Sequence, residues 1–162
     1  MSSAKQLVSS DSQGHYSLSR FATYLSQNYR HYLSSLLPDI GLSLSNYYIV
    51  LYLWHHQKSL PNGASQTQLS DNTLNDKAAV ARGVKKLLEL GYVDVASDPT
   101  NSSRNIVSLT NLGKSIGKQL NSWVLDWEEE ALSFLPAKRR TPFLDAFREL
   151  FFNMRNESHE KK

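Results

Sequence analysis

The sequence predicts a mainly α-helical protein that carries one small β-hairpin. Apolar residues recur three and four positions apart in successive segments, which indicates amphipathic helices. Two short runs, 92–96 and 104–109, instead alternate apolar and polar residues, and the stretch "SDPTNSS" between them is rich in turn formers. A group of three helices followed by such a hairpin is a winged helix-turn-helix. Further helices flank this unit on both sides, so the 162 residues suggest one domain with extensions.

The chain begins with a polar, Ser-rich stretch over residues 1–16, which we expect to be a flexible arm. The first helix, within 17–42, has its apolar stripe at Leu18, Phe21, Leu25, Tyr29, Tyr32, Leu33 and Leu36. Pro38 and Gly41 end it. Ser45 is expected to cap a second helix, "NYYIVLYLWHH", which is apolar nearly all round and is therefore expected to be the central buried helix.

The predicted winged unit spans 43–112. "SLPNGAS" is expected to be a loop, and Ser65 and Gln68 form the capping box of a short third helix that reaches about Asn72. Asn75 or Asp76 caps the fourth helix, and Gly91 ends it. The apolar stripe of this fourth helix consists of Val80, Val84, Leu87 and Leu88.

Two more helices are predicted within 113–156, followed by a solvated tail at 157–162. The fifth has its stripe at Leu112, Ile116, Leu120, Trp123, Trp127, Ala131 and Phe134, and Pro136 ends it. Thr141 caps the sixth, with Pro142 at its first helical position. The aromatic stripe of the sixth helix is either a partner surface or folds back onto the chain's own core. A symmetric homodimer is the commonest way to bury such faces. The predicted dimerisation residues are Phe21, Trp123, Phe143, Phe147, Leu150, Phe151 and Met154.

Composition excludes several classes of function. Cysteine is absent, which excludes disulfides, thiolate metal sites and cysteine nucleophiles. The start of the chain lacks the apolar core of a signal peptide, and the longest apolar run, 47–54, is too short to span a bilayer. We therefore expect a soluble, cytoplasmic protein with no membrane partner. We find no nucleophile elbow, phosphate-binding glycine loop or metal cluster, and the carboxylates of 128–130 diverge on a helix, so we expect neither an enzyme nor a cofactor.

The fourth predicted helix carries a basic face. At 100° per residue, Ala78, Arg82 and Lys85 share one side, with Lys77, Ala81 and Lys86 beside them, opposite the valine stripe. Small residues keep this side slim enough for the DNA major groove, where Arg82 would bond a guanine edge and the lysines would pair with phosphates. The alternative is an ordinary solvated face, because the formal net charge of +3 permits a polyanionic partner without requiring one.

The arrangement of motifs over about 66–115 resembles the MarR family of winged-helix transcription regulators. The matching features are the pattern D-K-x-x-V-x-R-x-x-x-x-L at 76–87, G-Y-V at 91–93, D-P at 98–99 and V-S-L-T-x-x-G at 107–113. The resemblance implies a dimer that places its recognition helices in successive major grooves of a pseudo-palindromic double-stranded DNA site. It also implies a wing that reaches the minor groove, and often repression that is relieved by a small aromatic or phenolic ligand.

Carried over by position, the resemblance puts Ala78, Ala79, Arg82 and Lys85 against the DNA and assigns Arg104 to the wing. The full set of predicted DNA-binding residues is Ser65, Gln66, Lys77, Ala78, Ala79, Arg82, Lys85, Lys86, Ser102, Ser103 and Arg104. One departure concerns the wing tip. Where the family often has Asp-Arg-Arg, this chain has Asn-Ser-Ser at 101–103, so we expect weaker wing contacts that neutralise fewer phosphates.

A ligand site is predicted near the junction of the first two helices. An aromatic cleft there would hold a phenolic acid, and its predicted residues are Tyr29, His31, Tyr32, Tyr48 and Trp54. The alternative is that these aromatic side chains are packing residues. A metal site is disfavoured, because the adjacent histidines at 55 and 56 point about 100° apart on a helix. The leading prediction is a dimeric, ligand-responsive repressor, and the alternative is a winged-helix interaction or architectural module without sequence-specific DNA binding.

Overall fold

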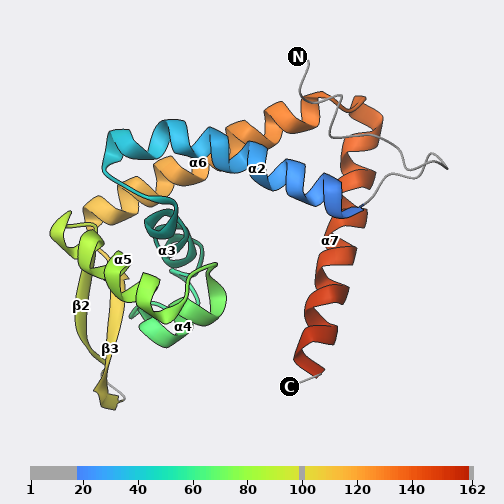
Figure 1. Ribbon diagram of the computed structural model, residues 1–162. Coiled ribbons are helices and arrows are strands. Elements are labelled where there is room, and N and C mark those ends of the chain that lie inside the picture. Colours follow the sequence, from blue (N-terminus) through green and yellow to red (C-terminus); the bar gives the residue numbers. More distant parts are fainter. Residues whose placement is uncertain (1–17, 99–100, 161–162) are drawn as a thin grey trace. The chain divides into compact units, whose positions relative to one another are not determined.

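The computed structural model describes residues 18–98 and 101–160, without the side chains at 102, 103 and 155–160 (Figure 1). The expected N-terminal arm at 1–16 lies outside the described residues. The chain divides into two compact units, one that extends to Ser122 and one that starts at Trp123. The expected fold class, mainly α-helical with a small antiparallel sheet in a winged-helix order, is confirmed.

The first described helix, α2, spans Leu18–Leu36 and continues into a 3-10 turn, η1, at Leu37–Ile40. Gly41 ends the turn with a φ of 70°, and its N–H donates to the carbonyl of Pro38. The predicted helix and its stop are therefore confirmed. Only the end of its apolar stripe is covered, because Leu33 is fully buried whereas Phe21 is 44% exposed.

The central helix, α3, spans Leu44–His55 and buries Tyr47, Ile49, Val50 and Leu53, as its composition predicts. The predicted cap at Ser45 is wrong, because Ser43 caps this helix. The Ser43 hydroxyl accepts from the Asn46 N–H, and the Asn46 side-chain oxygen accepts from the Ser43 N–H at 3.1 Å. Asn46 thus accepts the hydrogen bond from the N-cap N–H that a Glu or Gln accepts in the usual capping box.

Two helices follow in the order of a helix-turn-helix. Helix α4 spans Gln66–Asn72 and begins with the predicted capping box of Ser65 and Gln68. Helix α5 spans Lys77–Glu89, and its cap is Asp76, whose carboxylate accepts from the Ala79 N–H at 2.7 Å. Asn75, the alternative cap, instead accepts a hydrogen bond from the Ser45 hydroxyl at 2.8 Å.

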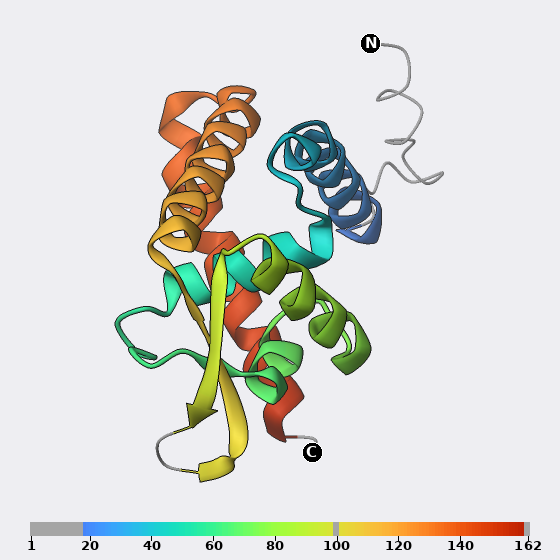
Figure 2. The ribbon, with the colours of Figure 1, turned by 90° about the vertical axis from the view of Figure 1, so that its left-hand side faces the viewer.

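The sheet has three strands, β1 (Ala64–Ser65), β2 (Val93–Asp98) and β3 (Asn101–Leu109), in the order β1-β3-β2. All neighbours are antiparallel. The hairpin of β2 and β3 projects beyond α4 and α5 (Figure 2). Both strands run further into the predicted turn than expected, with a register shift between Ser97 and Asp98.

The predicted loop at 59–65 needs a correction, because its last two residues form β1 against β3. Gly63 makes this pairing feasible, since a Cβ atom at this position would lie 2.3 Å from the Val107 carbonyl oxygen. The glycine also has a φ of 104°, which side-chain-bearing residues rarely adopt.

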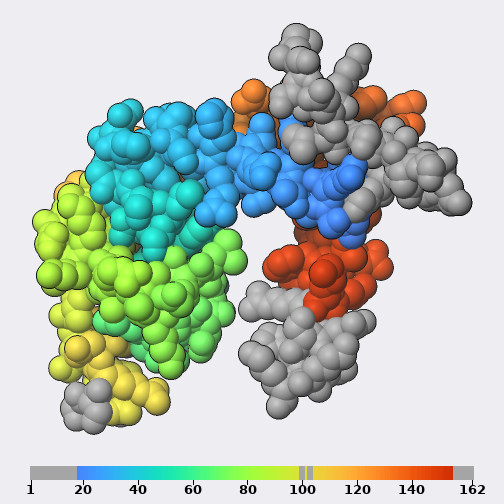
Figure 3. Space-filling model, viewed as in Figure 1, coloured from blue at the N-terminus to red at the C-terminus, as the bar shows by residue number. Residues whose placement is uncertain are grey.

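Helix α6 spans Asn111–Ser133, and its first turns complete the first unit. Ile116 and Leu120 are buried with residues of α3, α5 and the sheet in one core. The start of α6 is held close to β2, where the Thr110 hydroxyl donates to the Gly91 carbonyl at 2.7 Å and accepts from the Gly113 N–H at 3.0 Å. The space-filling view shows α3, α4, α5 and the hairpin as one continuous packed lobe (Figure 3).

The second unit contains the end of α6 and helix α7, Ala137–Glu160. The predicted start of this last helix at Thr141 is wrong by one turn, because the Arg139 N–H donates to the Pro136 carbonyl at 2.8 Å and begins the helix earlier. Pro142 therefore lies inside the helix. The helix also continues four residues into the segment 157–162 that we expected as a tail. No helix of the described residues is long and apolar enough to cross a bilayer.

Candidate nucleic-acid interface

The basic face of α5 is exposed as a continuous side of the helix. Its buried side consists of Val80, Gly83, Val84 and Leu87, whereas the exposed residues are Lys77, Ala78, Ala81, Arg82, Lys85 and Lys86. Ala79 is half-buried at the edge of this face. Leu88 is 49% exposed, so its assignment to the apolar stripe is wrong. No described residue forms an ion pair with any of the four cationic side chains, which leaves their charge available to an anion.

Close packing on α3 holds this helix in position. The backbones approach at Gly83, where a Cβ atom would lie 2.7 Å from the Ile49 Cδ1 atom. The glycine therefore permits a tight helix crossing. Asn46 is only 4% exposed, and its amide donates to the Gly83 carbonyl at 3.2 Å. The same side chain that caps α3 thus also ties α3 to the middle of α5.

A second exposed surface lies between the start of α4 and the hairpin. Ser65, Gln66 and Arg104, three of the predicted DNA-binding residues, line a depression of about 500 Å³. Its other lining residues are Thr67, Gln68, Asp98 and Asn105. The Ser65 hydroxyl accepts the capping bond from the Gln68 N–H and still has its own hydrogen to donate. The structure therefore gathers polar donors and one guanidinium at a single point. The backbone at Ser102 and Ser103 is in β3, and their side chains are outside the description.

These two surfaces have the chemistry that duplex DNA requires. A slim helix with a free arginine can enter a major groove about 12 Å wide, and flanking lysines can neutralise phosphates. Hydroxyl, amide and guanidinium donors at the start of α4 and on the hairpin are typical phosphate contacts. The candidate interface thus consists of α4, α5 and the hairpin.

The residues predicted to bind an aromatic ligand lie in different surroundings. Tyr29 and Tyr47 share a hydrogen bond between their hydroxyls, and the rings of Tyr47 and Tyr48 pack edge to face with centroids 5.1 Å apart. Tyr32 is half-buried and His31 is exposed, both on α2. Trp54 packs against Gly117 of α6, where a Cβ atom would lie 3.0 Å from its ring. Tyr47 and Trp54 are thus engaged in packing, whereas Tyr48 lines a separate pocket at the start of α3.

The predicted dimerisation residues are mostly exposed apolar side chains. On α7 they are Phe143, Phe147, Leu150, Phe151 and Met154, with exposed fractions between 40% and 61%. Leu144 and Phe152 on the same helix are also exposed, and Trp123 is half-buried. The rings of Phe143 and Phe147 stack with centroids 5.9 Å apart.

Fold and site together define a winged helix-turn-helix protein with a basic recognition-type helix. No protein-family model matches the chain. One curated relative is the HTH-type transcriptional regulator BilQ of Clostridium symbiosum, which is 25% identical over 120 residues, or 74% of this chain and 80% of that protein.

Solved structures match over most of the chain. A MarR transcriptional regulator from Methanosarcina mazei has a TM-score of 0.73 at 22% identity and covers 86% of this chain and 96% of its own. BpsR of Bordetella bronchiseptica, whose DNA binding is regulated by 6-hydroxynicotinic acid, has a TM-score of 0.65 at 17% identity and covers 83% and 92%. The chain has the fold of the MarR regulators, which confirms the resemblance that its residues predict.

Proposed function

We propose that the protein is a sequence-specific DNA-binding transcription regulator that acts as a homodimer in the cytoplasm. The observation that carries this proposal is the exposed side of α5, where Lys77, Arg82, Lys85 and Lys86 have no acidic partner among the described residues and surround small side chains. The regulator name of the relative BilQ supports the same class. Nothing in this function requires catalysis or a cofactor.

On DNA, α5 would lie in the major groove with Arg82 toward a base edge. Bidentate bonds from arginine to guanine are the commonest specific contact in this groove. Lys85 would pair with a phosphate, and the depression between α4 and the hairpin would hold another through Ser65, Gln66 and Arg104. Because the hairpin has polar uncharged residues at 101–103, its contribution to affinity should be small.

A homodimer would present two copies of α5 to the duplex. The exposed apolar residues of α7 and the uncovered start of the α2 stripe support this assembly, because apolar faces of this extent are usually buried in an interface. Two-fold symmetry would then require two half-sites about one helical turn, 10–10.5 bp, apart.

We further propose that the protein is a repressor whose DNA affinity changes when a small aromatic or phenolic ligand binds. The support is the likeness to BpsR, whose DNA binding responds to an aromatic acid, and the aromatic lining contributed by Tyr48. Such a ligand can lower the affinity for DNA only if it prefers the DNA-free state.

Selection of binding sites from a random duplex pool tests the proposal. We expect a two-fold symmetric motif that is enriched at moderate salt. If no sequence is enriched while the protein remains folded, the chain is an interaction or architectural module and its basic face has no role in reading sequence.

A further inference from the structure

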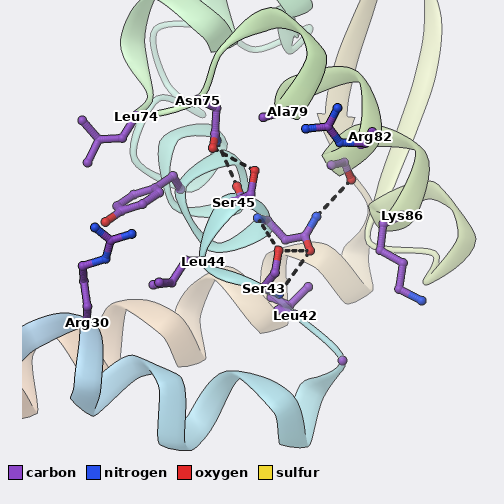
Figure 4. A pocket seen from close by; sticks show the side chains of 14 residues that line it. Arg30, Leu42, Ser43, Leu44, Ser45, Leu74, Asn75, Ala79, Arg82 and Lys86 are labelled. Atoms are coloured by element: carbon purple, nitrogen blue, oxygen red, sulfur yellow. Dashed lines mark hydrogen bonds between the residues drawn. The ribbon is translucent and has the colours of Figure 1, made fainter.

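The junction segment, residues 40–46, joins η1 to α3 and makes hydrogen bonds to the middle of α5 and to the residues on either side of that helix. Before the start of α5, the Ser45 hydroxyl donates to the Asn75 side-chain oxygen at 2.8 Å, and the Asn75 amide donates to the Ser45 carbonyl at 3.0 Å (Figure 4). In the middle, the Asn46 amide donates to the Gly83 carbonyl at 3.2 Å.

The same segment also holds the chain just after the end of α5. The Tyr92 hydroxyl donates to the Ile40 carbonyl at 3.2 Å, and the Tyr92 N–H donates to the Leu87 carbonyl of α5 at 2.9 Å. Leu90 lies beside the segment, because a Cβ atom at Gly41 would be 3.6 Å from the Leu90 Cδ2 atom. Hydrogen bonds at three separate points therefore restrict both sliding and tilting of α5 on α3.

Contacts to bases and contacts to phosphates differ in how precisely α5 must be placed. An arginine that bonds a guanine edge uses two N–H groups in a fixed fork, and such a site must be held within about 0.5 Å and 10–20°. A lysine ammonium on its flexible stem acts as a point charge, so it pairs with a phosphate over a range of positions. Loosening α5 should therefore weaken base reading by Arg82 more than it weakens the phosphate contacts of the lysines.

We propose that Ser45 and Tyr92 are positioning residues for sequence recognition, which hold Arg82 through α5 at the orientation that a base edge requires. The inference rests on the proposed DNA-binding function and adds residues outside the interface that determine its specificity. Both side chains are half-buried, and their hydroxyls donate to polar atoms of the chain itself. Neither belongs to the set of residues predicted to contact DNA.

Removal of the two hydroxyls tests the proposal with little change in shape. The variants are Ser45→Ala, Tyr92→Phe and the double variant, and the readout is the specificity ratio, the Kd for an unrelated duplex divided by the Kd for the selected duplex. We expect each single change to lower this ratio about threefold and the double variant about tenfold or more, as the loss of one or two hydrogen bonds implies. The Kd for the unrelated duplex should stay within about twofold, because phosphate contacts tolerate the looser helix.

Two matched variants control for the loss of a hydroxyl elsewhere. Ser59→Ala removes an exposed hydroxyl that donates to the His56 carbonyl at 3.2 Å, and Tyr52→Phe removes that of another half-buried tyrosine, on α3. Both should keep the specificity ratio of the wild type. A thermal melt sets a temperature at which every variant is folded. If the double variant lowers only Tm and keeps the ratio, the two residues are merely structural and the proposal is wrong.

A double-mutant cycle asks whether the two residues act through Arg82. In the Arg82→Ala background, Ser45→Ala and Tyr92→Phe should cost little further specificity, because the side chain that they position is already absent. An equal loss of specificity with and without Arg82 would overturn the proposed role.

Amide hydrogen exchange of the DNA-free protein measures the restraint on α5 independently of DNA binding. The backbone amides of 77–89 should exchange faster in the double variant than in the wild type, whereas those of 116–122 in α6 should not change. If the wild type discriminates between duplexes and the double variant discriminates equally well, the positioning role fails while the proposed function stands. If the wild type discriminates between no sequences, the proposed function fails and the role in recognition fails with it, while the exchange rates still show whether the junction segment restrains α5.

Discussion

At the residue scale, Asn46 links α3 to the middle of α5. Its side chain donates to the Gly83 carbonyl at a buried site and accepts from the Ser43 N–H and hydroxyl, which are part-buried. Removing it would take a partner from the buried Gly83 carbonyl and break the cap of α3, and a buried group that loses its partner costs about 1–3 kcal/mol.

We therefore predict that Asn46→Ala lowers the free energy of unfolding by about 2–3 kcal/mol. The measurement is urea denaturation followed by circular dichroism. Asn72→Ala is the matched control, because the Asn72 amide also donates to a backbone carbonyl, that of Gln68, but is exposed. We expect the control to cost less than about 0.5 kcal/mol. Equal effects of the two substitutions would show that the buried hydrogen bond stabilises the protein no more than an exposed one.

Arg104 carries the positive charge of the hairpin beside the start of α4. If Arg104 of each protomer neutralises one phosphate, Arg104→Ala should weaken binding to all DNA sequences alike and reduce the slope of log K against log salt by about 0.9 for each protomer bound. Fluorescence anisotropy with the selected duplex and an unrelated one, each at several salt concentrations, measures both quantities. A loss confined to the selected duplex would instead make Arg104 a base contact.

Single residues also mark where sequence reasoning stops. Helical spacing separated the buried valines of α5 from its basic face correctly, because both follow from 3.6 residues per turn. It misplaced Leu88, whose environment depends on neighbours outside the helix, and chose Ser45 as a cap because an Asn in place of Glu or Gln hid the box at Ser43. Sequence reasoning did not single out Arg30, which lines the pocket at the start of α3. Only the folded chain brings it near α5.

At the scale of elements, the junction between the hairpin and α6 depends on Gly113. A Cβ atom at this position would lie 1.8 Å from the Tyr92 carbonyl oxygen, which is backbone and cannot move aside. The glycine thus lets α6 begin directly against the start of β2.

Gly113→Ala should therefore destabilise the protein by at least about 2 kcal/mol, because overpacking against backbone cannot relax by a rotamer change. Differential scanning calorimetry measures this as a lower Tm. Lys114→Ala, an exposed neighbour on the same helix, should leave Tm nearly unchanged. A Gly113→Ala variant with the Tm of the wild type would contradict the close approach.

The elements themselves were largely predictable, because each helix has local periodicity and local stop signals. The exceptions have non-local causes. Strand β1 is only Ala64 and Ser65, and it exists because β3 pairs with it. Helix α7 starts at Ala137 with a hydrogen bond from the Arg139 N–H to the Pro136 carbonyl, so Pro142 lies beyond its first turn.

At the scale of the whole molecule, the account requires that two copies associate through apolar faces. Phe147→Glu would place a carboxylate within the exposed aromatic surface of α7, where burial of an unpaired charge costs several kcal/mol. We predict a shift from dimer to monomer in sedimentation velocity at micromolar concentration, with weaker binding to the selected site. Glu149→Ala, on the same helix, is the control and should remain dimeric. A monomeric wild-type protein would refute the assembly.

The most direct test of the central claim is a parallel selection from one random duplex pool with the wild-type protein and with Arg82→Ala. We predict a two-fold symmetric motif for the wild type and the same motif for the variant, except for a lost preference at one symmetry-related base pair. Affinity for the original motif should fall by about 1–3 kcal/mol for each half-site. An unchanged motif for the variant, or an equal loss of affinity for every sequence, would contradict a base-reading role for α5.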